Sequence, residues 1–225
     1  DIDDYNWPIP RNAFIGFAVG LILSCGYILL ANSMDTTVYG RNEIINNFKI
    51  PVIGIIPPHE EVVSIKKKRS KDSEKMSSIL AQRFILNEKT SFAVSEAYRM
   101  ARTNILYLPS EDSCKKIVIA SAVASEGKST CSINISETLA QAGKKVLLID
   151  ADMRRPRIAR YLSIDQQEGL SEYLAGISDN AEIIKNTDLG FDIIVSGNVS
   201  SSSAELLATP RVSTLLDECS KSYDY

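Results

Sequence analysis

The strongest constraint on the fold is the tetrapeptide GKST at residues 127–130, because of what stands on either side of it. The run before it, residues 115–121 (KKIVIAS), is short, apolar and rich in β-branched residues, and it predicts a buried strand. Residues 129–142 carry apolar side chains at helical spacing and precede Gly143, a common helix stop. Residues 144–150 (KKVLLID) predict a second buried strand. This order predicts a right-handed βαβ unit, with the loop at the carboxyl end of its first strand.

A loop in this position is suited to bind phosphate. The full motif is G-x-x-x-x-G-K-[ST], and Ala122 stands here at the first glycine position. Backbone N–H groups of the loop and of the helix N-terminus would face the anion. The Lys128 ammonium would reach the β- and γ-phosphates, and the Ser129 hydroxyl would bind Mg²⁺. The predicted nucleotide-binding residues are Ser125, Glu126, Gly127, Lys128, Ser129 and Thr130.

Two carboxylates follow the second predicted strand, in LLIDADMRRPR at residues 147–157. Asp150 and Asp152 are two residues apart, and the period of a strand would place both toward the phosphates. One can hold the magnesium shell, and the other can accept a proton from a hydroxyl nucleophile. The alternative is a capping or turn aspartate, which explains one such residue better than two. The predicted catalytic residues are Lys128, Asp150 and Asp152, and the predicted metal ligands are Ser129 and Asp150.

An uncharged run from residue 12 to residue 34 precedes these motifs. It is long enough to cross a hydrocarbon core of about 30 Å as one helix, and Trp7 just before it suits the membrane interface. A signal peptide is a poorer interpretation, because the start is acidic and the apolar run is too long. A buried helix of a soluble protein is the other alternative. The run predicts a single transmembrane helix.

Basic residues are in excess after this run. Arg11 precedes it, whereas Arg41, Lys49 and the cluster at 66–69 follow it. The excess predicts that the C-terminal part lies in the cytoplasm. Residues 59–89 predict a polar linker that either touches anionic lipid or is a solvated tether.

Composition excludes several other classes. The net charge of −3 gives no signal for nucleic-acid binding, and no nucleic-acid partner is expected. Four scattered cysteines and one histidine argue against a zinc site and against a disulfide framework. They suit free thiols in a reducing cytosol.

Four stretches together resemble the bacterial tyrosine kinases of capsule and exopolysaccharide systems. ASAVASEGKST resembles their Walker A loop, and LLIDADMRRPR resembles their family-specific Walker A′ motif. SEAYRMARTNI matches their E-x-x-R-x-x-R helix, and VYGRNEIINNFKIPVIGIIP resembles the segment after their second transmembrane helix. The resemblance covers essentially the whole chain and is closest to the fused type, in which a polysaccharide co-polymerase membrane segment precedes the kinase.

The resemblance implies an α/β P-loop NTPase fold, a parallel sheet flanked by helices as in the partition ATPases, preceded by one transmembrane helix. It divides the chain into four parts. Residues 1–11 would be the periplasmic or extracellular end of the co-polymerase domain, and residues 12–34 would be the transmembrane helix. Residues 35–90 would form the membrane-proximal segment and linker. Residues 91–225 would form the P-loop tyrosine-kinase domain, incomplete at its C-terminus.

By the same resemblance, the loop binds ATP with Mg²⁺, and the two aspartates position the metal and activate a tyrosine hydroxyl. Glu96, Arg99 and Arg102 would lie at a subunit contact, since residues three apart share one side of a helix. An exposed, salt-bridged helix is the alternative.

The implied function is an ATP-dependent protein-tyrosine autokinase that acts in trans. It would regulate capsular or exopolysaccharide polymerisation and export at the bacterial inner (plasma) membrane. The implied partners are further copies of the chain in a ring-like homo-oligomer, the polysaccharide polymerase and export machinery, and a cognate tyrosine phosphatase.

The sequence also departs from the family pattern. Many relatives have Pro-Gly at the positions of residues 124–125, and the signature lysine of partition ATPases is absent from residues 123–126. A third motif and a tyrosine cluster would come after Tyr225, and Tyr223 and Tyr225 are interpreted as the start of that motif's strand rather than as acceptors. We therefore expect a C-terminally truncated fragment that is inactive by itself, with residues 116–120 unpaired and their apolar face exposed.

Two other functions stay open. One is a membrane-tethered partition-type ATPase without kinase activity, and a tyrosine cluster would argue against it. The other is a structural co-polymerase whose nucleotide only sets the assembly state. In that case Lys128→Met would spare export but alter oligomer size.

Overall fold

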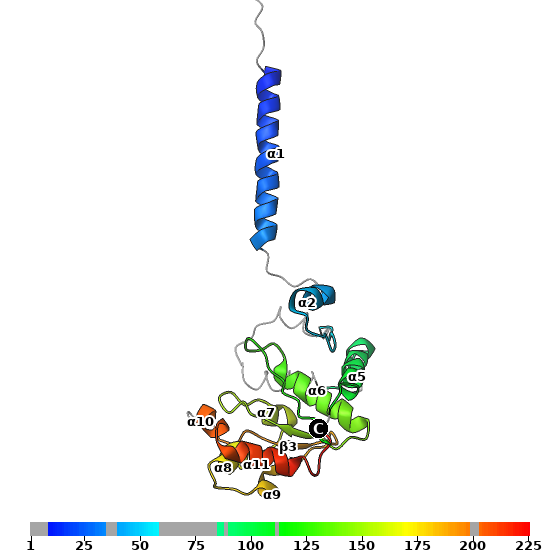
Figure 1. Ribbon diagram of the computed structural model, residues 1–225, viewed down its shortest axis with the longest axis vertical. Coiled ribbons are helices and arrows are strands. Elements are labelled where there is room, and N and C mark those ends of the chain that lie inside the picture. The colour runs from blue at the N-terminus through cyan, green and yellow to red at the C-terminus, as the bar shows by residue number, and fades with distance from the viewer. Residues whose placement is uncertain (1–8, 35–39, 59–84, 88–89, 111–112, 199–202) are drawn as a thin grey trace, which may run out of the picture. The chain divides into compact units, whose positions relative to one another are not determined.

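The structure is a computed structural model that describes residues 9–34, 40–58, 85–87, 90–110, 113–198 and 203–225 (Figure 1). The chain forms two compact units, Asp1–Val52 and Ile53–Tyr225. Trp7 and the basic cluster at 66–69 lie outside the described residues, as does most of the predicted linker.

The first unit contains the predicted membrane helix. Helix α1 runs from Ile9 to Met34, and its stretch Asn12–Met34 has a mean hydropathy of 2.3 with none of it buried. At 1.5 Å per residue that stretch is about 34 Å long, enough to cross a bilayer. The hydroxyl of Ser24 donates to the carbonyl of Leu21 at 2.9 Å, so this polar group is satisfied within the helix. A short helix, α2 (Arg41–Phe48), follows. The first unit thus contains one candidate membrane span.

The second unit is built around a three-stranded sheet in the order β1-β3-β2. Strand β1 (Leu147–Ile149) pairs in parallel with β3 (Asp192–Ile194), and β2 (Ile184–Asn186) pairs with β3 in antiparallel fashion. The predicted second strand is therefore confirmed as β1. The sheet is mixed rather than purely parallel, because β2, which follows a short helix, α9 (Asn180–Ile183), is joined to β3 by a short turn and so runs antiparallel to it.

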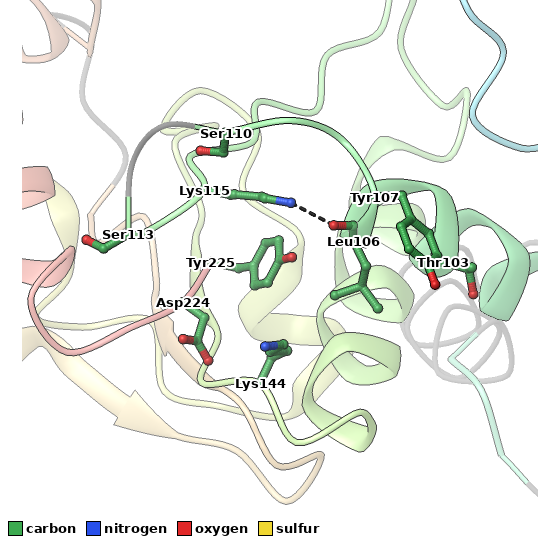
Figure 2. A pocket seen from close by; sticks show the side chains of 9 residues that line it. All are labelled: Thr103, Leu106, Tyr107, Ser110, Ser113, Lys115, Lys144, Asp224 and Tyr225. Carbon is green, nitrogen blue, oxygen red and sulfur yellow. Dashed lines mark hydrogen bonds between the residues drawn. The ribbon is translucent and has the colours of Figure 1, made fainter.

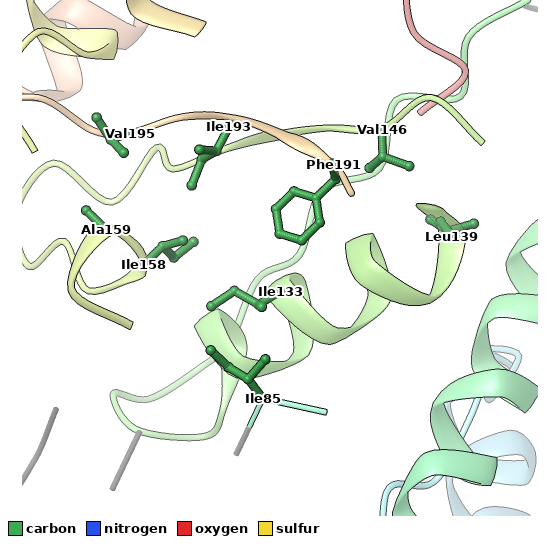
Figure 3. Packing of buried hydrophobic residues seen from close by; sticks show 9 residues of the cluster. All are labelled: Ile85, Ile133, Leu139, Val146, Ile158, Ala159, Phe191, Ile193 and Val195. Atoms are coloured by element: carbon green, nitrogen blue, oxygen red, sulfur yellow. The ribbon is translucent and has the colours of Figure 1, made fainter. Parts of the chain in front are cut away.

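Both faces of the sheet are covered, which is the layering expected of an α/β fold. Successive residues of a strand point to opposite faces. Ile193 and Val195 pack with Ile133 and Leu139 of helix α6 on one face, as Figure 3 shows. Ile194 packs on the other face with a second cluster. That second cluster comprises Met153, Leu170, Tyr173, Leu174, Ile183, Ile194, Leu215 and Cys219.

The two long helices of the second unit are those that the sequence predicts. They are α5 (Phe92–Leu106) and α6 (Lys128–Gln141), which pack against each other, and α6 also packs on β1. Helix α6 ends as expected at Gly143, which has a φ of +78°. Its N–H donates to the carbonyl of Ala140 at 2.9 Å, and the next N–H, of Lys144, donates to that of Leu139 at 3.2 Å.

Among the described residues, four further helices complete the second unit together with α9. They are α7 (Ile158–Leu162), α8 (Leu170–Leu174), α10 (Ser203–Leu207) and α11 (Pro210–Cys219), with α9 lying between α8 and β2.

Both ends of the predicted linker are attached to these long helices. Before it, the amide of Asn104 on α5 donates to the carbonyl of Ile53 at 2.6 Å, and a Cβ added to Gly54 would lie only 3.1 Å from the Cβ of Ala101. After it, the N–H of Leu86 donates to the buried amide oxygen of Asn134 on α6 at 3.1 Å. The compact unit thus begins at Ile53, although we expected the domain to start at residue 91.

The prediction of a buried strand at residues 115–121 is wrong for this chain. The segment has no strand structure, Val118 is 90% exposed, and Ile117 is 44% exposed. A strand is stable only when a neighbour pairs with its backbone. Among the described residues, one backbone hydrogen bond joins this segment to another part of the chain. The N–H of Lys115 donates it to the carbonyl of Asp224 at 2.8 Å. No backbone bond joins residues 116–120 to another described segment, and all of them except the half-buried Ile119 are exposed, which confirms the expectation that this run is unpaired and largely exposed.

The segment that ends at Tyr225 lies between this run and β1. The N–H of Asp224 donates to the carbonyl of Lys145 at 2.8 Å, and the N–H of Leu147 donates to that of Tyr225 at 3.0 Å. The hydroxyl of Tyr223 donates to the Asp192 carboxylate at 2.7 Å. Both tyrosine side chains also pack against the hydrophobic clusters. The backbone of this segment is thus bonded on both sides, but residues 223–225 have no strand structure, so the interpretation of these tyrosines as strand residues stays a prediction.

Lys115 closes the C-terminal end of α5. Its ammonium donates to the carbonyls of Leu106 at 2.8 Å and Leu108 at 2.7 Å, and lies 3.4 Å from that of Ile105. Figure 2 shows it above the Tyr225 ring, at 5.8 Å from the ring centroid. The open pocket drawn there is also lined by Lys144, which precedes β1. The pocket therefore lies at the N-terminal end of β1, the opposite end of this strand from the candidate site.

Replacing this lysine should loosen α5. Lys115→Met removes a cation from helix carbonyls that otherwise have no intrahelical donor, and we expect a loss of about 1–2 kcal/mol of stability. The measurement is amide hydrogen exchange across α5 in the detergent-solubilised chain. Lys116→Met is the matched control, because Lys116 makes only an exposed ion pair with Asp217 at 3.3 Å and its loss should be nearly neutral. Equal protection of α5 in both variants would contradict the capping role.

Candidate active site

The predicted phosphate loop spans residues 121–127 and leads directly into α6, whose first residue is Lys128. Gly127 stands at the N-cap with a φ of +96°, a conformation that glycine adopts without steric cost. Ser125 has a φ of +71°, which is unusual for a residue with a Cβ. The family resemblance implies glycine at this position, and Ser125 adopts the left-handed backbone conformation without being the residue that favours it.

The loop is open to a ligand. Its residues 121–126 are exposed, and the first turn of α6 is half-buried. The carboxylate of Glu126 accepts the backbone N–H of Val123 at 3.2 Å. A carboxylate oxygen therefore occupies a loop donor of the kind that a phosphate oxygen would use. The structure places all six predicted nucleotide-binding residues in this loop and helix start.

Lys128 reaches across to the end of β1. Its ammonium donates to the Asp152 carboxylate at 2.8 Å, and both side chains are 33% exposed. The hydrogen bond from Lys128 is the main reason why the pKa of Asp152 lies below its ordinary value. The other oxygen of Asp152 accepts the N–H of Arg155 at 3.1 Å. The structure thus brings together two of the three predicted catalytic residues.

Asp150 lies beside this pair in a different environment. It is only 3% exposed, and its Oδ1 accepts the N–H of Asp152 at 3.1 Å. Burial raises its pKa to about 6. Its Oδ2 is buried without a hydrogen-bond partner among the described residues. A buried, unpartnered carboxylate oxygen fits a proton or a cation.

The magnesium that the resemblance implies fits this arrangement only with help from a ligand. Among the described residues no group of three or more acidic, histidine or cysteine side chains could hold a metal. Mg²⁺ commonly binds through one or two carboxylates together with substrate phosphates. Asp150 and the Ser129 hydroxyl would supply the protein ligands, and a nucleotide would supply the rest.

The three predicted contact residues on α5 do not behave alike. Arg99 and Glu96 form a half-exposed ion pair at 3.5 Å. Arg102 instead donates to the carbonyl of Thr138 on α6 at 3.2 Å, and its Nε has no partner among the described residues. Arg102 therefore connects α5 to α6, and the role of the three residues at a subunit contact stays a prediction.

The sequence analysis missed two features near these residues. Glu137 on α6 is buried beside α5, and burial raises its pKa to about 7. Glu172 holds a turn at the end of β3 through several hydrogen bonds. Glu172 lies three residues after the N-cap Gly169 and accepts its N–H, which is the glutamate half of a capping box, and this spacing is a local signal that could have indicated it.

Comparison with known proteins decides the family. An AAA domain model matches residues 114–225. A putative tyrosine-protein kinase in the cps region of Klebsiella pneumoniae is 33% identical over 215 residues, which is 94% of this chain and 28% of that protein. The kinase domain of the Escherichia coli tyrosine kinase ETK has a TM-score of 0.69 at 28% identity, over 83% of this chain and 71% of that domain. The BceF tyrosine kinase domain has a TM-score of 0.67 at 31% identity, over 82% of this chain and 73% of that domain.

The chain belongs to the bacterial tyrosine kinase family. The P-loop NTPase fold is confirmed, and membership of this family implies nucleotide binding. The chain spans less than a third of the length of the curated kinase from Klebsiella pneumoniae. The loop and both aspartates lie within the residues that the AAA model matches.

The two aspartates should affect stability in opposite directions. Because the folded state holds Asp150 at a pKa of about 6, against an ordinary 3.8, it binds more protons than the unfolded state between these values. Stability contributed by this site is therefore lost as pH rises through that window. Asp150→Asn should stabilise the metal-free chain at pH 7.5 by on the order of 2 kcal/mol, and by less at pH 4.5.

The measurement is urea unfolding followed by circular dichroism, with a chelator present. Asp152→Asn is the contrasting variant, because Lys128 lowers the pKa of the Asp152 carboxyl in the wild-type chain. Removing this carboxylate should lower the free energy of unfolding at pH 7.5, and the loss should become smaller as pH falls. If Asp150→Asn instead lowers stability at pH 7.5, burial does not destabilise the charged Asp150 carboxylate as the structure indicates.

Proposed function

We propose that this bacterial tyrosine kinase transfers the γ-phosphoryl group of ATP to a tyrosine of another copy of itself. The observation that carries the proposal is the Lys128–Asp152 contact of 2.8 Å beside a buried, unpartnered Asp150 oxygen. Phosphoryl transfer to a hydroxyl requires a phosphate-binding loop, a cation that can reach the phosphates, and carboxylates that can bind metal and accept a proton. Family membership supports the same activity.

The ion pair gives the site a dependence on nucleotide. When Lys128 turns to the β- and γ-phosphates, Asp152 loses the hydrogen bond that most lowers its pKa. Its carboxylate then becomes a better proton acceptor at the moment when the phosphoryl donor is in place. Asp150 and Ser129 would hold magnesium, which when bound neutralises charge on the phosphates.

The transfer step then uses groups of this chain. The tyrosine oxygen forms a bond to the γ-phosphorus, and the bond from that phosphorus to the bridging oxygen of ADP breaks. The hydroxyl proton passes to the Asp152 carboxylate. Lys128 and the loop N–H groups stabilise charge on the phosphate oxygens, and catalysis is mainly positioning and electrostatic stabilisation.

The proposed setting is the bacterial inner membrane, with the kinase part in the cytoplasm. The candidate span Asn12–Met34 supports membrane attachment, and the basic excess after it supports the orientation. Action on polysaccharide polymerisation and export is supported by the cps-region relative. Further copies of the chain and a tyrosine phosphatase complete the proposed partners.

Substitutions at the three site residues test the activity. In the full protein, as its host makes it, Asp150→Asn and Asp152→Asn should each lower tyrosine phosphorylation by roughly 10²–10⁴-fold, since each removes a positioned base or ligand. ATP affinity should fall less than in Lys128→Met. The assays are a phosphotyrosine blot and titration with a fluorescent ATP analogue. Asp217→Asn, at an exposed carboxylate, is the control and should be neutral. Near-normal phosphotyrosine in both aspartate variants would contradict the proposed roles of Asp150 and Asp152.

The orientation has a separate test. Protease added outside intact cells should leave the chain after residue 35 uncut, because the span would place it in the cytoplasm. The assay uses an antibody to the kinase part, with permeabilised cells as the control in which the basic stretch at 66–75 becomes accessible. Cleavage in that stretch in intact cells would reverse the proposed orientation.

A further inference from the structure

Four arginines follow the two predicted catalytic aspartates within a short stretch of the chain. Each is exposed, and they are Arg154, Arg155, Arg157 and Arg160. Among the described residues, none of them forms an ion pair. The side chain of Arg154 donates from its Nε to the Ser203 hydroxyl at 3.4 Å. The other three present guanidinium groups that no carboxylate in the described chain pairs with.

The backbone that carries these arginines is held by buried neighbours. Met153, which is 1% exposed, packs in the hydrophobic cluster on one face of the sheet. Ile158 and Ala159 pack in the cluster on the other face. Between these anchors, the ring of Pro156 restricts the backbone further. The exposed side chains of this segment, which we call the arginine turn (residues 154–160), therefore project from an ordered backbone.

The arginine turn contacts the proposed base directly. Oδ2 of Asp152 accepts from the Lys128 ammonium at 2.8 Å, and Oδ1 accepts the backbone N–H of Arg155 at 3.1 Å. The residue that would hold the phosphates and the arginine turn thus meet the same carboxylate, each at a different oxygen. An acceptor whose hydroxyl reaches Asp152 must therefore bring its neighbouring residues close to the arginine turn.

The charge of the turn indicates which neighbouring residues it would favour. Consecutive residues of an extended peptide are about 3.3 Å apart, so those up to three positions from the acceptor tyrosine lie within about 10 Å of it. Unpaired guanidinium groups in this range attract carboxylates and repel cations. A guanidinium can also bind a carboxylate through two parallel hydrogen bonds. The turn is therefore complementary to an acceptor with aspartate or glutamate near its tyrosine.

We propose that Arg155 and Arg157 select acceptor segments in which acidic residues flank the tyrosine. Arg160, three residues after Arg157, extends the same basic surface along α7. The acceptor is a segment of a second copy of the chain. This inference rests on the proposed kinase function and adds the class of peptide that its active site accepts.

Removing the two charges tests the selection. The assay uses the full protein at saturating ATP, with an otherwise wild-type Lys128→Met copy as acceptor. Arg155→Gln combined with Arg157→Gln should raise the KM for this acceptor about tenfold, since each exposed ion pair contributes a factor of about two to five. Arg155→Lys combined with Arg157→Lys keeps both charges and should recover most of the loss. Arg41→Gln, at an exposed residue of α2, is the control and should leave the KM unchanged.

A binding measurement identifies the chemistry of the partner without requiring turnover. Fluorescein-labelled polyglutamate should bind the wild-type protein, and binding should weaken as salt is raised. The double glutamine variant should bind it at least fivefold more weakly. Unlabelled polyglutamate should compete with the acceptor copy, whereas polylysine of the same length should not. Affinity for a fluorescent ATP analogue should stay within twofold of wild type in all these variants.

The outcomes separate the two claims. An unchanged acceptor KM in the double glutamine variant, or an equal loss of ATP affinity, would overturn the inference and leave the kinase function intact. Binding to phosphatidylserine vesicles that this variant loses, with an unchanged acceptor KM, would assign the arginines to a membrane surface and also overturn it. If the wild-type protein binds polyglutamate but phosphorylates no tyrosine, the proposed function fails, and the arginines remain an anion-binding surface without this role.

Discussion

The contact between Lys128 and Asp152 is the interaction on which the rest of the site depends. It joins the first residue of the phosphate-loop helix to the carboxyl end of β1, over 2.8 Å. Both partners are half-exposed, so the contact is accessible to a ligand that offers Lys128 a better anion. The contact thereby brings a helix N-terminus and a strand end together at the site where we propose phosphate binding and proton acceptance.

The two neighbouring aspartates acquire different properties from burial and from Lys128. Asp152 is kept ionised by a cation, whereas Asp150 is buried with one oxygen unpartnered and has a raised pKa. A buried carboxylate without a partner costs stability, and such cost is common where a ligand completes the site. This difference suits the two tasks that we propose for them, cation binding by Asp150 and proton acceptance by Asp152.

The sequence predicts what depends on local pattern. The helix after GKST, its end at Gly143, strand β1 and the position of both aspartates follow from spacing and from turn residues. What it could not predict depends on contacts between distant segments. The run at 115–121 is apolar enough for a strand but pairs only at Lys115, and Arg102 faces α6 because the two helices pack together. The turn held by Glu172 needs the start of α8 to pack against the end of β3, which no local pattern shows.

The most direct test of this account is a structure of the full protein with a non-hydrolysable ATP analogue and magnesium. The distance to measure is from the Lys128 ammonium to the β- and γ-phosphate oxygens and to Asp152. The account predicts that Lys128 leaves Asp152 and lies within hydrogen-bond distance of the phosphates, with the Asp152 carboxylate then free to face the acceptor side. A nucleotide bound with Lys128 still on Asp152, or bound away from the loop, would contradict it.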